Sequence, residues 1–244
     1  MAMSHVLVLA KAPVPGYAKT RLCPRYSAVE ATEIATAALA DTLETIARCD
    51  VDRRILALDG QPGPWLPSGF EIVHQVSGSL NERLAAAWAH AGGPGIQIGM
   101  DTPQITAELI HDSLATVLPG PADAALGPAE DGGWWAIAAS ERDPGVLSQM
   151  FHGVPMSSQY TARAQAARLR SLGMTVRTMR TLRDLDDADD ARAIAALIPG
   201  SHTATAVDSI GDAHLAARQH AGRSGIGMRP ETAGAASSYR AHPG

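Results

Sequence analysis

The chain has 244 residues, 45% of them hydrophobic and 18% charged, which are ordinary values for a globular protein with a sizeable core. Its formal net charge of −5 and its pI of about 6.0 argue against a nucleic-acid-binding protein, which usually presents a basic face. A small anionic ligand is not excluded, because a local cluster of cations is enough to bind one.

Short apolar runs and helix-capping patterns alternate along the chain. Two capping boxes, Ser27 to Glu30 and Ser79 to Glu82, each mark the start of a helix. The predicted order is strand 5–10, helix 27–48, strands 53–59 and 71–75, helix 79–91, strand 95–101, helix 106–117, strands 122–129 and 134–140, helix 160–172, strand 174–179 and helix 184–197.

This alternation predicts an α/β fold, a three-layer α/β/α sandwich around a mostly parallel, mixed sheet. Strand 134–140 is expected to run antiparallel, because the turn before it is short. After residue 200 the composition shifts to Ala, Gly, Ser and His without a long apolar period. We therefore expect one domain over residues 1–199 and a flexible, disordered tail over residues 200–244.

The two cysteines, Cys23 and Cys49, form no CxxC pair and no metal-binding pattern with histidine, so reduced thiols are expected. The N-terminal apolar run stops at Lys11, so no secretion signal is visible. No stretch approaches the roughly 18 apolar residues of a membrane span. The sequence thus predicts a cytoplasmic protein without nucleic-acid or membrane partners, and it leaves the oligomeric state open.

The loop after the first strand concentrates positive charge. It lies within AKAPVPGYAKTRL, residues 10–22, and carries Lys11, Lys19 and Arg21 among prolines. Gly16 allows backbone N–H groups to approach an anion closely, which fits a nucleotide diphosphate. The segment is not a Walker A motif, since GxxxxGK[ST] is absent. A solvated surface loop is an equally weighted alternative.

Two further segments follow strands whose ends should meet at one edge of the sheet, where ligands of open parallel sheets bind. In GMDTP, Asp101 is placed to hold a divalent cation, or alternatively to accept hydrogen bonds from the turn after it. In GPAEDGGWW, two glycines allow a close backbone approach and one of the two tryptophans faces the cleft. The alternative is that EDGG is a simple hairpin turn.

Two motifs at helix starts have local explanations. The acids of DLDDADD, residues 184–190, favour the dipole of the helix they open, and a metal role for Asp186 is the minority interpretation. Glu82 is interpreted as a capping residue, whereas Arg83 next to it is a candidate contact for phosphate or carboxylate.

In this order, AKAPVPGYAKTRL, SLNERL, GMDTP, GPAEDGGWW and LRDLDDADD resemble a bacterial family of uncharacterised glycosyltransferase-like proteins. The resemblance covers about residues 5–198 and implies the GT-A fold of nucleotide-diphospho-sugar transferases. A more distant likeness is to 2-phospholactate or phosphoenolpyruvate guanylyltransferase and to molybdenum-cofactor nucleotidyltransferases.

Together with these motifs, the resemblance implies roles for individual residues. Asp101 and Asp131 are the catalytic candidates, and Asp101 with Asp186 would hold Mg²⁺ or Mn²⁺. The candidates for nucleotide or phosphate binding are Lys11, Gly16, Lys19, Thr20, Arg21 and Arg83. The candidates for acceptor binding are Gly132, Gly133, Trp134 and Ser157.

The sequence departs from the family pattern on the acceptor side, with Met156 where Trp is usual and Asn81 where Gly is usual. Asp187 stands where the family has Thr. The acceptor is therefore the least determined part of the expectation.

The resemblance implies a metal-dependent glycosyltransferase-like enzyme that uses a nucleotide-diphospho-sugar donor and a small-molecule acceptor. One alternative is a nucleotidyltransferase that uses a nucleoside triphosphate and a phosphorylated or carboxylate acceptor. That enzyme would favour a basic acceptor pocket, whereas no cation lies near DGGWW in the sequence. A second alternative is a non-catalytic nucleotide-binding domain.

Overall fold

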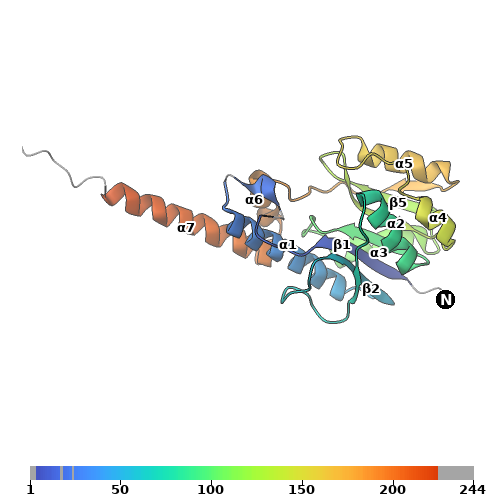
Figure 1. The fold of residues 1–244 in the computed structure, drawn as a ribbon, viewed down its shortest axis with the longest axis horizontal. Helices are drawn as coiled ribbons and strands as arrows, with labels where there is room; N and C mark the ends of the chain where they lie inside the picture. The colour runs from blue at the N-terminus through green and yellow to red at the C-terminus, as the bar shows by residue number, and fades with distance from the viewer. Residues whose placement is uncertain (1–3, 17–18, 24, 225–244) are drawn as a thin grey trace, which may run out of the picture. The chain divides into compact units, whose positions relative to one another are not determined.

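The computed structural model describes residues 4–16, 19–23 and 25–224. The chain divides after Val207 into two units. Within the described residues the first unit is built on a seven-stranded sheet of order β3-β2-β1-β4-β6-β5-β7 (Figure 1). The strands are β1 (His5–Lys11), β2 (Arg53–Asp59), β3 (Glu71–His74), β4 (Gly95–Gly99), β5 (Ala124–Pro128), β6 (Trp134–Ala139) and β7 (Val176–Thr178).

Helices connect most of the strands. They are the short 3₁₀ helix η1 (Thr20–Leu22) and the α-helices α1 (Ala28–Ala47), α2 (Leu80–Ala91), α3 (Ala107–Val117), α4 (Pro144–Gln149), α5 (Thr161–Ser171), α6 (Ala188–Leu197) and α7 (His202–Ser224). None of the helices in the described part of the chain is long and apolar enough to cross a membrane.

The pairing of the strands determines which residues meet. β1 pairs in parallel with β2 and β4, β2 with β3, and β5 with β7, whereas β6 runs antiparallel to both β4 and β5. The antiparallel direction predicted for residues 134–140 is therefore confirmed. Because β6 is reversed, its first residue, Trp134, lies at the same edge of the sheet as Lys11 and the residue after Gly99.

Side chains that alternate along the strands build a core on each face of the sheet. In β1, Val6 and Val8 point into the first core, and Leu7 points into the second. The first core is closed by apolar residues of α1 and α3, and the second by those of α2, α4 and α5. The predicted three-layer α/β/α sandwich is thus the observed architecture.

Both predicted capping boxes are present. The Ser27 hydroxyl accepts from the backbone N–H of Glu30 while the Glu30 carboxylate accepts from the N–H of Ser27, and Ser79 and Glu82 repeat the arrangement. This confirms the structural interpretation of Glu82. The predicted strand 95–101 is shorter than expected, since β4 ends at Gly99 and Asp101 follows in a turn.

The sequence-based expectation for residues 200–244 needs correction, because α7 occupies residues 202–224. The start of α7 is capped locally by Ser201, whose hydroxyl accepts from the backbone N–H of Ala204 at 3.0 Å, and also from outside its own segment. Asp41 of α1 accepts hydrogen bonds from the backbone N–H groups of His202 and Thr203 at 3.0 and 2.8 Å, and from the Thr203 hydroxyl at 2.6 Å. Ser201 was a local signal for this helix, whereas the local sequence cannot show the cap that Asp41 supplies. Residues 225–244 of the expected tail lie outside the described residues.

Candidate functional site

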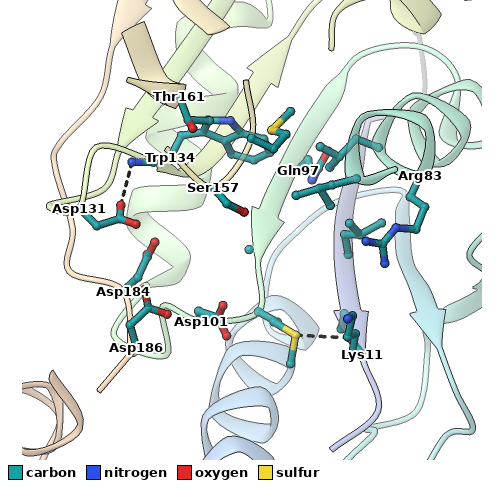
Figure 2. A pocket seen from close by; sticks show the side chains of 18 of the residues that line it. Lys11, Arg83, Gln97, Asp101, Asp131, Trp134, Ser157, Thr161, Asp184 and Asp186 are labelled. Atoms are coloured by element: carbon teal, nitrogen blue, oxygen red, sulfur yellow. Dashed lines mark hydrogen bonds between the residues drawn. The ribbon is translucent and has the colours of Figure 1, made fainter. Parts of the chain in front are cut away.

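A cavity of about 730 Å³ opens where the ends of β1 and β4 meet the start of β6. This is the position at which open α/β sheets bind ligands. Figure 2 shows acidic side chains on one side of the cavity, Lys11 and Arg83 on the other, and Trp134 and Ser157 between them. Nine residues proposed from the sequence line it: Lys11, Arg21, Arg83, Asp101, Asp131, Gly133, Trp134, Ser157 and Asp186.

Lys19 lies behind this lining and joins two of its carboxylates. Its ammonium is 2.8 Å from Asp101 Oδ1 and 3.3 Å from Asp186 Oδ1, and it also donates to the backbone carbonyl of Leu185. The Lys19 side chain is only 10% exposed. Burial alone would lower the pKa of this ammonium, but Asp101 and Asp186 outweigh burial and raise it, so Lys19 is held charged.

The sequence left open that Asp101 accepts hydrogen bonds from the turn that follows it. In the described structure its buried Oδ1 accepts none from that turn. Its Oδ1 is buried and forms an ion pair with the Lys19 ammonium. The Asp101 backbone carbonyl accepts from the N–H of Leu185 at 2.7 Å. The end of β4 is therefore tied to the segment before α6 by both backbone and side chain.

Asp184 is a site residue that the sequence analysis missed. It lines the cavity, and burial raises its pKa to about 8, helped by the nearby carboxylates of Asp101, Asp131 and Asp186. Leu185 between the two acids is fully buried. The alternation of acid, apolar residue and acid in an extended segment was the available signal, because it places Asp184 and Asp186 on the same side.

The turn between β5 and β6 is a hairpin turn and also part of the cavity wall. Asp131 Oδ1 accepts from the backbone N–H of Gly133 at 2.7 Å, and the Gly132 N–H donates to the carbonyl of Ala129. Gly132 has a φ of +91°, and a Cβ there would lie 2.1 Å from the carbonyl oxygen of Gln159. The lack of a side chain at Gly132 thus allows two backbone segments to pack directly.

The side chains of the two tryptophans lie on opposite faces of the sheet, as strand alternation predicts. Trp134 lines the cavity and packs against Phe151 at a ring-centroid distance of 6.2 Å. Trp135 is buried in the first core, where its indole donates to the carbonyl of Arg180 at 2.8 Å. Only Trp134 is available for stacking against a ligand.

The segment that carries Met156 and Ser157 is fixed from several directions. Asn81 Nδ2 donates to the carbonyls of Phe151 and Val154 at 2.6 and 2.9 Å, so the unusual residue in SLNERL anchors the wall of the cavity. Ser157 has a φ of +55°, a conformation that costs energy for a residue other than glycine and often marks functional sites. Its hydroxyl points toward the centre of the cavity in Figure 2.

Other residues from the sequence analysis lie outside the lining. Gly16, with a φ of +81°, and Gly132 are not among the described residues that line the cavity. Thr20 begins η1, and its side chain is outside the described part of the structure. The first loop thus contributes charge through Lys19 and Arg21, of which Lys19 acts from behind the wall.

The acidic side fits a divalent cation that is completed by substrate. No three His, Cys, Asp or Glu side chains within the described ranges are grouped to hold a metal ion by themselves. Mg²⁺ is commonly bound by one or two carboxylates together with phosphate oxygens, and the carboxylate of Asp101, about one-third exposed at the cavity, offers one such ligand. The donors are all hard oxygens, which suits Mg²⁺ or Mn²⁺.

Comparison with known proteins identifies the family. The profile of a family described as "Uncharacterized protein conserved in bacteria (DUF2064)" matches residues 34–158, just over half of the chain. The chain belongs to the DUF2064 family. This confirms the resemblance to an uncharacterised bacterial GT-A-like family. No curated protein matches this DUF2064 chain in sequence.

Solved structures establish the fold. A "putative nucleotide-diphospho-sugar transferase" from Desulfovibrio desulfuricans G20 is 22% identical, with a TM-score of 0.75 over 86% of this chain and 95% of the other. The CMP:2-keto-3-deoxy-manno-octonic acid synthetase complexed with CTP is 15% identical, with a TM-score of 0.50 over 80% and 98% of the two chains. A cytidylyltransferase from Leptospira borgpetersenii serovar Hardjo-bovis is 9% identical, with a TM-score of 0.50 over 88% and 96%. The DUF2064 chain therefore has the fold of nucleotide-diphospho-sugar transferases and cytidylyltransferases.

Proposed function

We propose that this protein is a metal-dependent transferase that moves a glycosyl group from a nucleotide-diphospho-sugar to a small-molecule acceptor. The observation that carries the proposal is the acidic cluster of Asp101, Asp184 and Asp186 around Lys19, at the edge of the sheet where this fold binds ligands. The structural likeness to a protein described as a nucleotide-diphospho-sugar transferase supports the choice of donor.

In this proposal the acidic side receives the diphosphate. Asp101 and either Asp186 or Asp184 would hold Mg²⁺ or Mn²⁺, which supplies positive charge to the phosphate oxygens when it is bound. Lys19 and Arg21 then stabilise the negative charge that develops on the leaving nucleoside diphosphate. Arg21 is suited to this, since its exposed side chain reaches Asp186 at 3.3 Å from the rim of the cavity.

The acceptor would lie along the wall formed by Trp134, Gly133 and Ser157. Its hydroxyl oxygen attacks the anomeric carbon of the sugar as the bond from that carbon to the diphosphate breaks. Asp131 takes the hydroxyl proton as general base. Asp131 already accepts from the N–H of Gly133, which fixes its carboxylate at the edge of the cavity.

A thermal-shift screen tests the proposal. We expect one nucleotide-diphospho-sugar to raise the melting temperature only with Mg²⁺ or Mn²⁺, because ligands that bind the native state stabilise it by mass action. At 100 times the Kd the gain is about 2.7 kcal/mol, or a few degrees for a domain of this size. Asp101→Asn should abolish the shift, whereas Asp112→Asn, an exposed acid on α3 outside the cavity, should keep it. An equal shift in chelator would contradict the metal-dependent mechanism.

Nucleotidyl transfer is the second candidate, and one observation favours it. No cation lies near DGGWW in the sequence, but Lys11 and Arg83 line the side of the cavity opposite the acidic side chains. A basic side suits the anionic acceptor of a nucleotidyltransferase. Two structural neighbours with this fold are a cytidylyltransferase and a synthetase complexed with CTP. Stabilisation by a nucleoside triphosphate alone, with release of pyrophosphate on turnover, would favour this reaction.

Both reactions predict turnover. A non-catalytic nucleotide-binding domain would show the metal-dependent thermal shift without product formation. Asp131→Asn separates the cases further, because it should keep nucleotide binding and lose glycosyl transfer.

A further inference from the structure

The cations on the two sides of the cavity differ in whether they have acidic partners. In the described structure Arg21, which lines the cavity, is paired with Asp186. Lys19, which lies behind the lining, is paired with Asp101 and Asp186. On the opposite side, Lys11 is exposed at the end of β1, and no interaction of its ammonium is found within the described residues. The acidic side thus contains its own cations, whereas the basic side keeps unused positive charge.

Arg83 is placed in the cavity with few partners. Its side chain is 20% exposed, and its Nε is buried without a hydrogen-bond partner in the described structure. Its one acidic neighbour, Asp59, lies 3.9 Å away and is more than half exposed, so this ion pair is weak. Buried donors of proteins are almost always satisfied, and an exception calls for an explanation such as an absent ligand.

The orientation of the Arg83 guanidinium is fixed by Gln75. Gln75 Nε2 donates to the carbonyls of Ala10 in β1 and Ala57 in β2 at 2.8 and 2.9 Å. Both partners are acceptors, so the amide nitrogen faces the strands and Oε1 faces the cavity. Arg83 Nη1 donates to this Oε1 at 3.2 Å. A side chain anchored on two strands therefore holds the guanidinium in one place.

We propose that Arg83 and Lys11 form a second anion subsite, which binds a phosphate or carboxylate group of the acceptor apart from the diphosphate at the acidic side. A guanidinium held in this way presents parallel N–H donors that match both kinds of anion, and Lys11 adds a mobile point charge. This inference rests on the proposed function, because it takes the cavity to be the substrate site. It names the acceptor class as an anionic compound.

Calorimetric titration with inorganic phosphate in chelator and low salt tests the subsite without involving a metal. We expect the full chain to bind phosphate, and Arg83→Gln to weaken the Kd by about tenfold or more, as for a lost charge-assisted pair. Arg83→Lys should fall between the two, because it keeps the charge but loses the fork. Arg25→Gln is the matched control, since it removes the same charge from an exposed residue that pairs with Asp189 outside the cavity, and it should bind as the unchanged protein does.

Lys11→Gln is a second variant, and we expect it to fold as the unchanged protein does, because Lys11 is exposed at the end of its strand. It should weaken phosphate binding several-fold without lowering the melting temperature. No phosphate binding by the unchanged protein, or equal affinity in the Arg83 and Arg25 variants, would overturn the subsite. These outcomes are independent of the metal-dependent nucleotide binding that tests the proposed function.

A competition experiment distinguishes the source of the anion. The protein is saturated with a nucleoside diphosphate and Mn²⁺ and then titrated with a hexose 6-phosphate and with the unphosphorylated hexose. Binding of the phosphorylated sugar alone, lost in Arg83→Gln, supports an anionic acceptor. If the sugar phosphate binds when the nucleotide is absent but not when the protein is saturated with it, a nucleotide phosphate fills the subsite, and the acceptor assignment would be wrong.

Discussion

Lys19 connects the stability of the site to its proposed chemistry. Its backbone has a φ of +53°, a conformation that costs of order 1 kcal/mol for a residue other than glycine. The contacts of its ammonium with Asp101, Asp186 and the Leu185 carbonyl hold it there. Without that ammonium the carboxylates of Asp101 and Asp186 would face one another unshielded.

Lys19→Met should therefore destabilise the protein in chelator by about 2 kcal/mol, less than a fully buried pair because both acids are about one-third exposed. If Asp101 and Asp186 hold a divalent cation, Mn²⁺ should recover part of this loss, and the variant should gain more from Mn²⁺ than the unchanged protein does. Urea denaturation with and without Mn²⁺ measures both effects. Arg192→Met, at an exposed pair with Asp189, should change stability by less than 0.5 kcal/mol. A Lys19→Met protein as stable as the original in chelator would show that the cluster needs no cation.

Residue-level sequence patterns located part of the candidate site. GMDTP and GPAEDGGWW follow strands, so their place at one edge of the sheet could be predicted from topology. The separate environments of Lys19 and Arg83 could not, because Asp101 and Asp186 lie far from Lys19 in sequence and Gln75 is set by hydrogen bonds to two strands. Such partners become visible only when the chain is folded.

At the scale of elements, the turn between β5 and β6 is packed against the start of α5. The carbonyl of Gly132 accepts from the N–H of Ala162, and the Gly132 Cα faces the Gln159 carbonyl. The Thr161 hydroxyl donates to the carbonyl of Pro155 at 2.8 Å, which closes the segment on itself. The position of Ser157 on the wall thus depends on a glycine outside the lining.

Gly132→Ala should cost about 3 kcal/mol, because the added Cβ would lie 2.1 Å from a backbone oxygen and the φ of +91° is itself unfavourable for alanine. Gly153→Ala separates the two causes, since Gly153 has a φ of +73° with no atom near the position of a Cβ. It should cost about 1 kcal/mol. The free energies of unfolding from urea titrations measure both. Equal losses would show that the segment at Gln159 moves away without cost.

Helices with both a local start signal and a long apolar period were predictable, and helices without the apolar period were not. Ser27, Ser79 and Thr106 each cap a helix within their own segment, as the sequence indicated. Helix α4 has a local cap in Asp143 but only six residues, too few for an apolar period. Helix α7 has a local cap in Ser201 besides the cap from Asp41 of α1, but it was missed because its sequence has no long apolar period.

At the scale of the whole molecule, His5 and Asp184 give the free energy of unfolding opposite dependences on pH. Burial lowers the pKa of His5 to about 4, with a smaller contribution from the charge of Arg53. Burial and neighbouring carboxylates raise the pKa of Asp184 to about 8. Between pH 4 and 6.5 the unfolded chain binds a proton at His5 that the native protein does not, so stability falls as the pH falls. Between pH 4 and 8 the native protein binds a proton at Asp184 that the unfolded chain does not, so stability falls as the pH rises.

The two effects oppose each other at about 1.4 kcal/mol per pH unit below pH 6.5, and Asp184 acts alone above it. The unchanged protein should therefore have a nearly flat stability profile from pH 4.5 to 6 in chelator and lose stability toward pH 8.

His5→Phe, which keeps a ring beside Trp88, should remove the His5 contribution of about 3 kcal/mol, so that stability rises as the pH falls from 6.5 to 4. Asp184→Asn should give the reverse profile, with stability falling over the same range and no loss toward pH 8. Urea titrations at half-unit intervals of pH measure all three profiles. Parallel profiles for the protein and His5→Phe would mean that His5 titrates in the native state as it does in the unfolded chain, and its burial would then carry no pH dependence.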